Sequence, residues 1–285
     1  MNVVLICPGE EAMAPFLGPE RPLLAVGLLG QSLLEYWLSH LARSGAQQVV
    51  VVAHDRPDEV GKVVSDGSRW GLTVSVFSET GPLTPPDALL KYAGYLNSAP
   101  ASSGVILPNH FPGFADHPLF TGPAEFMAAL QVWMPQALTP DRVGMREVRP
   151  GIWAGVNSAI SPGAKLAAPC WVGQHVLVGP DAIIGPGTVI EDGVVIEPFA
   201  EIEDSWIGTR TLVGQFTRLQ SALAWGNRVV NWKTGTASVV PDPFVLCALN
   251  RIPRGASRGL LTRITELYRR NKERAPLLVE GARTA

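Results

Sequence analysis

An aliphatic residue returns at every sixth position through the middle of the chain. This period fits neither an α-helix, which repeats every 3.6 residues, nor a simple strand, which repeats every two. Six residues are the length of one side of a triangular β-solenoid, in which three hexads make a coil and the coils stack. The spacing therefore predicts stacked coils with these side chains inside: Ile160, Leu166, Val172, Val178, Ile184, Ile190, Ile196 and Ile202.

A second register supports the same fold. A small or β-branched residue stands four positions after each aliphatic one, as Val176 does after Val172, and we expect it to fit inside the prism at the corner. After Ile202 one residue is dropped, and the pattern resumes at Ile207. A corner can absorb such a slip, so the sequence predicts about four coils.

The hexads Val172-Gly173-Gln174-His175-Val176-Leu177 and Ile184-Gly185-Pro186-Gly187-Thr188-Val189 resemble the repeats of hexapeptide proteins. The resemblance implies a left-handed β-helix, which we place at residues 149–245. In hexapeptide acyltransferases a histidine acts as general base toward an acceptor hydroxyl or amine. His175 is the candidate for that role. Its hexad also places it at the corner position of Asp181 and Gly187, which predicts an exposed turn residue.

Strand and helix patterns alternate through residues 1–148. Buried strands are predicted over residues 3–6, 48–53, 72–77 and 104–107, with helices after Ser32, from Pro57 to Val64, and from Thr84 to about Leu96. Ser32 followed three residues later by Glu35 is a capping box. This alternation predicts a Rossmann-like α/β domain with an open parallel sheet, whose ligands bind beyond the carboxyl ends of the strands.

This half resembles the nucleotide-binding domain of sugar-1-phosphate nucleotidyltransferases. The segments that carry the resemblance are Arg21-Pro22-Leu23-Leu24-Ala25-Val26, Leu33-Leu34-Glu35-Tyr36, and residues 46–52, 66–72 and 79–89. In several such enzymes, including N-acetylglucosamine-1-phosphate uridyltransferases, the domain is followed by a left-handed β-helix. The resemblance implies nucleotide or sugar-nucleotide binding and a Mg²⁺ cofactor if the protein is active.

The family's phosphate-binding and metal-binding motifs are altered in this chain. The glycine-rich loop that cradles the phosphates keeps Gly9 but carries Glu10, whose charge opposes polyphosphate binding. Arg21 replaces the lysine expected before proline, and Gly81 lies in the segment that covers the nucleotide base. Asn109 stands where an aspartate would hold magnesium. These residues are the expected nucleotide and metal contacts, with Arg21 as the catalytic candidate.

The leading hypothesis is a nucleotidyltransferase homologue of sugar-nucleotide or polysaccharide metabolism with reduced or lost catalysis. Its role would be sugar-nucleotide binding, regulation or scaffolding. Three alternatives stay open: an active Mg²⁺-dependent sugar-1-phosphate nucleotidyltransferase, a hexapeptide acyltransferase using His175, and a purely structural oligomer. We expect a homo-oligomer under each of these hypotheses.

Composition excludes some partners and compartments. A net charge of −2 gives no reason to expect nucleic acid. Three cysteines without a close pair argue against a disulfide framework and favour a reducing, cytoplasmic setting. The sequence has no apolar run of membrane-spanning length.

Three tryptophans lie near the end of the predicted solenoid. Trp206, Trp225 and Trp232 are predicted to cap the open end of the prism or to line a subunit interface.

The tail, residues 246–285, is rich in arginine. Five apolar residues fall at helical spacing and predict an amphipathic basic helix. We expect this helix to pack on the solenoid, and contact with an anionic membrane or an acidic partner is the alternative. The apolar residues are Leu260, Leu261, Ile264, Leu267 and Tyr268.

Overall fold

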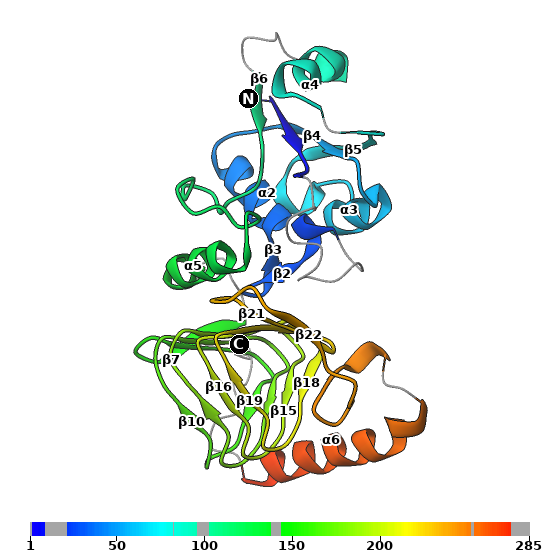
Figure 1. Cartoon of the computed structure of the whole chain (residues 1–285). Coiled ribbons are helices and arrows are strands. Elements are labelled where there is room, and N and C mark those ends of the chain that lie inside the picture. The colour runs from blue at the N-terminus through cyan, green and yellow to red at the C-terminus, as the bar shows by residue number, and fades with distance from the viewer. Residues whose placement is uncertain are drawn as a thin grey trace. The chain divides into compact units, whose positions relative to one another are not determined.

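The structure is a computed structural model that describes residues 2–8, 22–81, 83–95, 103–137, 144–251 and 254–274. The chain divides into two compact units, Met1–Glu125 and Phe126–Ala285. The first is an α/β unit and the second contains stacked coils of short strands with a long helix beside them (Figure 1).

The α/β unit is built on a four-stranded parallel sheet with the order β5-β4-β1-β6. Its predicted parallel arrangement is confirmed. Consecutive valines of β4 are buried, as expected for a strand covered on both faces. The strands are β1 (Asn2–Ile6), β4 (Gln48–Ala53), β5 (Thr73–Ser78) and β6 (Ser103–Ile106), beside a small hairpin of β2 (Gly27–Leu28) and β3 (Gln31–Ser32).

Local signals determine where the helices of this unit begin and end. The Ser32 hydroxyl accepts from the Glu35 amide, and the Glu35 carboxylate accepts from the Ser32 amide, so the predicted capping box is confirmed. Helix α2 (Leu33–Arg43) ends shortly before Gly45, which adopts φ +80°. The other helices are α3 (Pro57–Val64) and α4 (Pro85–Tyr92), and α4 is followed by a 3₁₀ turn, Ala93–Tyr95.

The second unit contains a β-helix with three faces. Each face is named here by what lies outside it. The polar face contains β10 (Lys165–Leu166), β13 (Ile183–Ile184), β16 (Glu201–Glu203) and β19 (Arg218–Gln220). The tryptophan face contains β8 (Ile152–Gly155), β11 (Cys170–Val172), β14 (Thr188–Ile190), β17 (Trp206–Ile207) and β20 (Ala222–Trp225). The helix face contains β9 (Ala159–Ile160), β12 (Leu177–Val178), β15 (Val195–Ile196) and β18 (Thr211–Val213).

The interior of the β-helix is formed by the predicted aliphatic residues. Seven of the eight are fully buried there, together with small partners such as Ala182, whereas Leu166 is partly buried. The register confirms the slip: Ile184 pairs with Ile202, eighteen residues on, and Ile202 pairs with Leu219, seventeen residues on. Coils of both lengths therefore keep their aliphatic side chains in one column.

Antiparallel strands extend two faces of the β-helix. β7 (Met145–Arg149), β21 (Arg228–Asn231) and β22 (Ala237–Val239) join the tryptophan face, and β23 (Leu246–Ala248) pairs with β18. Helix α5 (Pro123–Trp133) enters this unit at Phe126. None of the helices within the described residues is long and apolar enough to cross a bilayer.

The prediction that the tryptophans cap the end of the prism is wrong for Trp206. It lies on the outside of the tryptophan face, where its ring meets Phe126 of α5 edge-on at 5.4 Å and its Nε1 donates to the buried Glu191 carboxylate. Trp225 packs edge-on against Trp206, and the Trp232 indole donates to the Asp204 carbonyl. Adjacent strand residues face opposite ways, which places Trp206 outside because Ile207 lies inside.

Helix α6 (Arg254–Arg274) covers the helix face, as predicted for the packed alternative. Leu260 and Leu267 are buried on outward-facing residues of the strands, including Leu177, Val195 and Leu212. Leu261 and Tyr268 are exposed. Only part of the predicted apolar set therefore faces the β-helix.

Candidate functional site

One corner of the β-helix, between the tryptophan face and the helix face, carries a column of residues in left-handed conformation. We call it the His175 corner. Three of these residues donate their backbone N–H to a carbonyl of the preceding coil: His175 to Val156 at 3.1 Å, Gly193 to Gln174 at 2.8 Å and Arg210 to Asp192 at 3.0 Å. The column consists of Asn157, His175, Gly193 and Arg210, with φ between 52° and 69°.

The turn around His175 is held by buried hydrogen bonds. The Ser158 hydroxyl donates to the Gly173 carbonyl at 2.6 Å and accepts from the Val176 amide at 3.0 Å. The Asp192 carboxylate accepts from the Gln174 amide at 2.7 Å. These contacts bracket the turn on both sides, so the position of the imidazole is set by the coils above and below it.

His175 is exposed, which confirms the predicted corner position. The next coil has Gly193 at the same place, so that coil adds no side chain of its own beside the imidazole. A Cβ on Gly193 would lie 3.3 Å from Cγ of Arg210, which shows that the arginine stem runs along this space. Two strand spacings separate His175 from Arg210, about 10 Å in all. The corner thus offers a proton acceptor and a permanent cation on one open edge.

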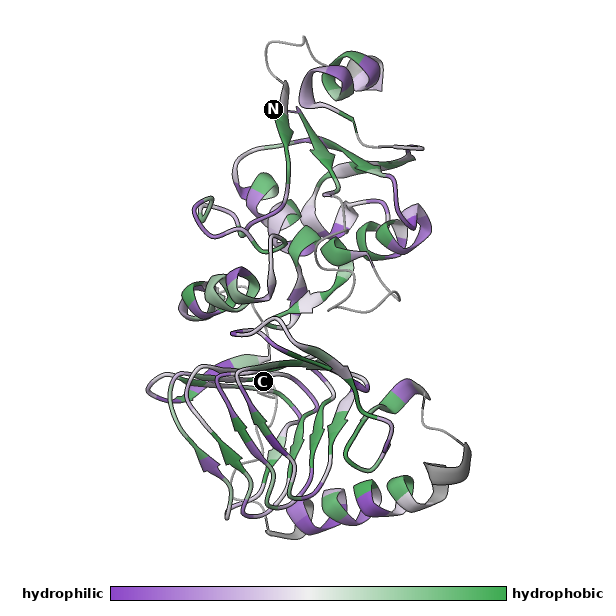
Figure 2. Ribbon diagram, in the orientation of Figure 1, coloured by the Kyte–Doolittle hydropathy of each residue, from purple (hydrophilic) through white to green (hydrophobic). Residues whose placement is uncertain are grey.

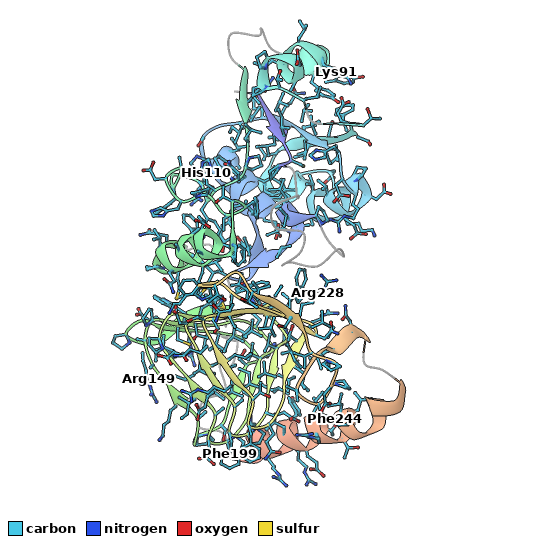
Figure 3. All side chains as sticks on the ribbon, in the orientation of Figure 1. Lys91, His110, Arg149, Phe199, Arg228 and Phe244 are labelled. Atoms are coloured by element: carbon cyan, nitrogen blue, oxygen red, sulfur yellow. The ribbon has the colours of Figure 1, made fainter. Side chains whose placement is uncertain are left out.

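The carboxyl edge of the α/β sheet presents a second group of polar residues. Glu79, just after β5, accepts from the Tyr92 hydroxyl and pairs with Lys91 at 2.5 Å. Hydrogen bonds from Lys91 and then Tyr92 lower the pKa of Glu79, and burial followed by the Glu79 hydrogen bond raises the pKa of Tyr92. Gly81 lies in the bend two residues later, and Figure 3 labels Lys91 on α4.

Asn109 follows β6 and is exposed. Its Oδ1 lies 2.8 Å from Nδ1 of His110, whose pKa burial lowers. The Asn109 side chain is therefore in contact with the neighbouring imidazole. Figure 3 labels His110 in this loop, and its backbone carbonyl accepts from the Trp37 indole at 2.8 Å.

Three of the predicted nucleotide contacts, Gly9, Glu10 and Arg21, lie outside the described residues. The residue predicted to contact magnesium, Asn109, is a neutral amide within the described residues. Asn109 is engaged by His110, and the described part of the chain has no group of three His, Cys, Asp or Glu side chains that could hold a metal. Gly81 and Asn109 belong to the first unit, whereas His175 belongs to the second.

The buried polar partners of the β-helix could not be found by sequence reasoning. Glu191 and Glu197 occupy the position after an inward aliphatic residue, where the hexad tolerates glycine or an exposed acid. Both are buried, and their partners are distant in sequence: Trp206 for Glu191 and Arg263 for Glu197. The only signal in the sequence was an acidic residue directly after an inward-facing aliphatic one. The partner of each carboxylate is determined by the tertiary packing.

Residues 169–204 match the family model Bacterial transferase hexapeptide (six repeats). This stretch of the chain therefore consists of hexapeptide repeats of the left-handed β-helix type, and it includes His175. The match covers the coils that form the centre of all three faces.

Solved structures with similarity to the chain include two acetyltransferases. The acetyltransferase domain of PglB from Neisseria gonorrhoeae is 11% identical, with 79% of this chain and 88% of that chain covered and a TM-score of 0.19. A mutant of perosamine N-acetyltransferase from Caulobacter crescentus, in complex with CoA and GDP-perosamine, is 14% identical, with 85% and 98% covered and a TM-score of 0.19.

Proposed function

We propose that this protein is a hexapeptide-repeat acyltransferase that works in sugar-nucleotide metabolism. The observation that carries the proposal is that the matched transferase repeats contain His175, held on an exposed corner beside the side-chain-free Gly193. An imidazole accepts a proton near neutral pH and is the commonest general base in enzymes. The proposal favours the acyltransferase alternative over loss of all catalysis.

The reaction would move an acyl group from an acyl-CoA thioester to an amine or hydroxyl. His175 takes the proton from the acceptor as its nitrogen or oxygen bonds to the acyl carbon. The carbon–sulfur bond then breaks, and the CoA thiolate leaves and recovers the proton. Arg210, on the same edge, is placed to attract the phosphates of CoA, because a guanidinium binds phosphate through paired N–H donors.

The α/β unit would by itself bind a nucleotide. Its parallel sheet, and its resemblance to nucleotidyltransferases around Gly81, support nucleotide binding beyond the carboxyl ends of the strands. The acidic Glu10 and the engaged Asn109 argue against pyrophosphate chemistry there. The unit would thus retain binding while nucleotidyl transfer is reduced or lost.

The test is a turnover assay with acetyl-CoA and a panel of amino-sugar and hydroxy-sugar nucleotides, in which a thiol-reactive dye detects free CoA. We expect release only with a matching acceptor, and a rate lower by about 10²–10⁴-fold in His175→Asn. Asparagine tolerates the left-handed backbone, so the corner should keep its shape. Asp181→Asn is the matched control, because Asp181 has φ 57° against 56° for His175 and lies on another corner.

A thermal-shift screen with the same ligands separates binding from turnover, since a ligand of the folded state raises the melting temperature. Equal rates in His175→Asn and the parent protein would overturn the assignment of the base. Release of pyrophosphate from a nucleoside triphosphate and a sugar 1-phosphate, lost in Arg21→Ala, would show an active nucleotidyltransferase instead. No shift with any ligand would leave a structural oligomer.

A further inference from the structure

Helix α6 has two different apolar sides. Leu260 and Leu267 are buried against the helix face, whereas Leu261 is 54% exposed and Tyr268 is 51% exposed. The two exposed residues are seven positions apart, which places them two turns apart on one side of the helix. Figure 2 shows hydrophobic and hydrophilic residues along the coloured part of α6.

The rotation of α6 about its axis is fixed by two polar contacts. The Asn271 amide, itself buried, donates to the Ala159 carbonyl at 3.0 Å and to the Val178 carbonyl at 2.9 Å. Arg263 pairs with the buried carboxylate of Glu197. These contacts hold the inner side against the β-helix, so Leu261 and Tyr268 are presented on the outer side.

Charge is concentrated on this helix. Residues 254–274 contain seven basic and two acidic residues, a net charge of +5, whereas the whole chain has −2 and the remainder therefore −7. Arg269 and Arg270 are exposed and directly follow Tyr268. In the sequence, Arg258 lies three residues before Leu261, and Lys272 lies four residues after Tyr268.

We propose that the outer side of α6 is a docking surface for an anionic lipid bilayer. The positive charge of the helix is complementary to acidic headgroups, which attract each basic residue held near the surface. A leucine and a tyrosine between these cations suit the headgroup region, because tyrosine has an apolar ring and a polar hydroxyl. An acidic protein segment would use the arginines but would leave both apolar side chains in water.

The geometry makes this attachment peripheral and reversible. The larger apolar side of α6 is already buried on the β-helix, so only Leu261 and Tyr268 are available to enter the interface. Attraction would therefore be mainly electrostatic and would weaken as salt screens the headgroups. Membrane contact through α6 is independent of acyl transfer at His175.

The test is co-sedimentation of the full chain with phosphatidylcholine vesicles that contain 0 or 40% phosphatidylglycerol, at low and high salt. We expect binding only to the anionic vesicles at low salt. Arg269→Gln with Arg270→Gln should lower the partition coefficient roughly 25-fold, about fivefold for each charge. Leu261→Ser with Tyr268→Ser should weaken binding even where the charges are intact.

The matched control removes two exposed arginines elsewhere on the second unit, Arg149→Gln with Arg218→Gln, and should bind as the parent protein does; Figure 3 labels Arg149. Circular dichroism and the acyl-transfer assay check that each variant is folded. Absence of binding to anionic vesicles at low salt would overturn the proposal, as would an equal loss in the control. Binding to polyglutamate but not to vesicles would also overturn it and identify an acidic protein as the partner class.

Discussion

The α/β unit and the β-helix are both built from parallel strands, but they place candidate functional residues in different ways. In the β-helix the corners lie in register from coil to coil, so the period that positions Ile184 in the core also positions His175, Gly193 and Arg210 on one edge. In the α/β unit the strands fix only the core, and the candidate contacts lie on loops of individual sequence. A repeat therefore makes a site position predictable from spacing, whereas a loop site requires its own motif.

The sharpest test of this difference uses two neighbouring isoleucines on β13. Ile184 is 0% exposed and Ile183 is 41% exposed, although both have the same side chain. Ile184→Ala should cost about 2–5 kcal/mol of unfolding free energy, because it leaves a cavity in the prism. Ile183→Ala should cost less than about 1 kcal/mol. Urea unfolding measures both, and equal costs would contradict the assignment of inside and outside from the six-residue period.

The Arg263–Glu197 contact tests how far α6 belongs to the β-helix. Arg263→Met should cost about 1–3 kcal/mol at neutral pH. The range is below that of a fully buried pair, because the arginine side chain is 37% exposed. Urea unfolding of the variant measures the cost. A cost within experimental error would show that this pair does not contribute to holding the helix.

The same contact predicts a dependence of stability on pH. Burial raises the pKa of Glu197 above its usual value of 4.5, against the opposing effects of the Gln215 amide and Arg263. The folded state thus binds this proton more tightly than the unfolded state. The resulting stabilisation is fully present below pH 4.5 and is lost as the pH rises through the folded pKa. Glu197→Gln should remove this decline in stability with rising pH. Arg263→Met should extend the decline in stability to higher pH. Unfolding midpoints from pH 4 to 8 would test the prediction, and parallel curves would contradict it.

An effect of similar size is expected at Asn271. Asn271→Ala would leave the carbonyls of Ala159 and Val178 without this donor under the helix, at a cost of about 1–3 kcal/mol. Thr265→Ala, on the exposed side of the same helix, should change stability by less than about 0.5 kcal/mol. Hydrogen exchange of β9 and β12 should rise only in the first variant, and a similar rise in both would mean that α6 is loosely placed.

The smallest effect tests the α/β unit by itself. Ser32→Ala removes the N-terminal cap of α2 and should cost about 1 kcal/mol, whereas Ser44→Ala at the other end should cost a few tenths. Hydrogen exchange within residues 33–43 measures the change directly. Protection within residues 160–213 should not change, and a change there would show that the two units do not respond separately.

Much of the fold was predictable because its signals are local. The hexad gave the core of the β-helix and the slip after Ile202, Ser32 with Glu35 gave the start of α2, and Pro57 gave the start of α3. Each of these depends on residues a few positions apart. His175 was predicted as a corner residue for the same reason.

Contacts between distant segments were not predictable in this way. Leu260 and Leu261 are both leucines in one helix, and only docking on the helix face decides which is buried. Arg263 and Glu197 are 66 residues apart, and no spacing rule joins them. The position of Trp206 likewise depends on a distant contact, with Phe126 of α5. It was expected at the end of the prism, but it lies on the outside of the tryptophan face.

The shortened corner after Ile202 has a consequence for how such a chain can change over time. Deleting a residue within a strand would turn every following side chain to the opposite surface. At this corner the loss left Ile207, Val213 and Leu219 in their columns, and the following coils still stack in register. Insertions and deletions can therefore accumulate at corners during evolution while the strands stay constant in length, and alignments of related chains should show their gaps at these three edges.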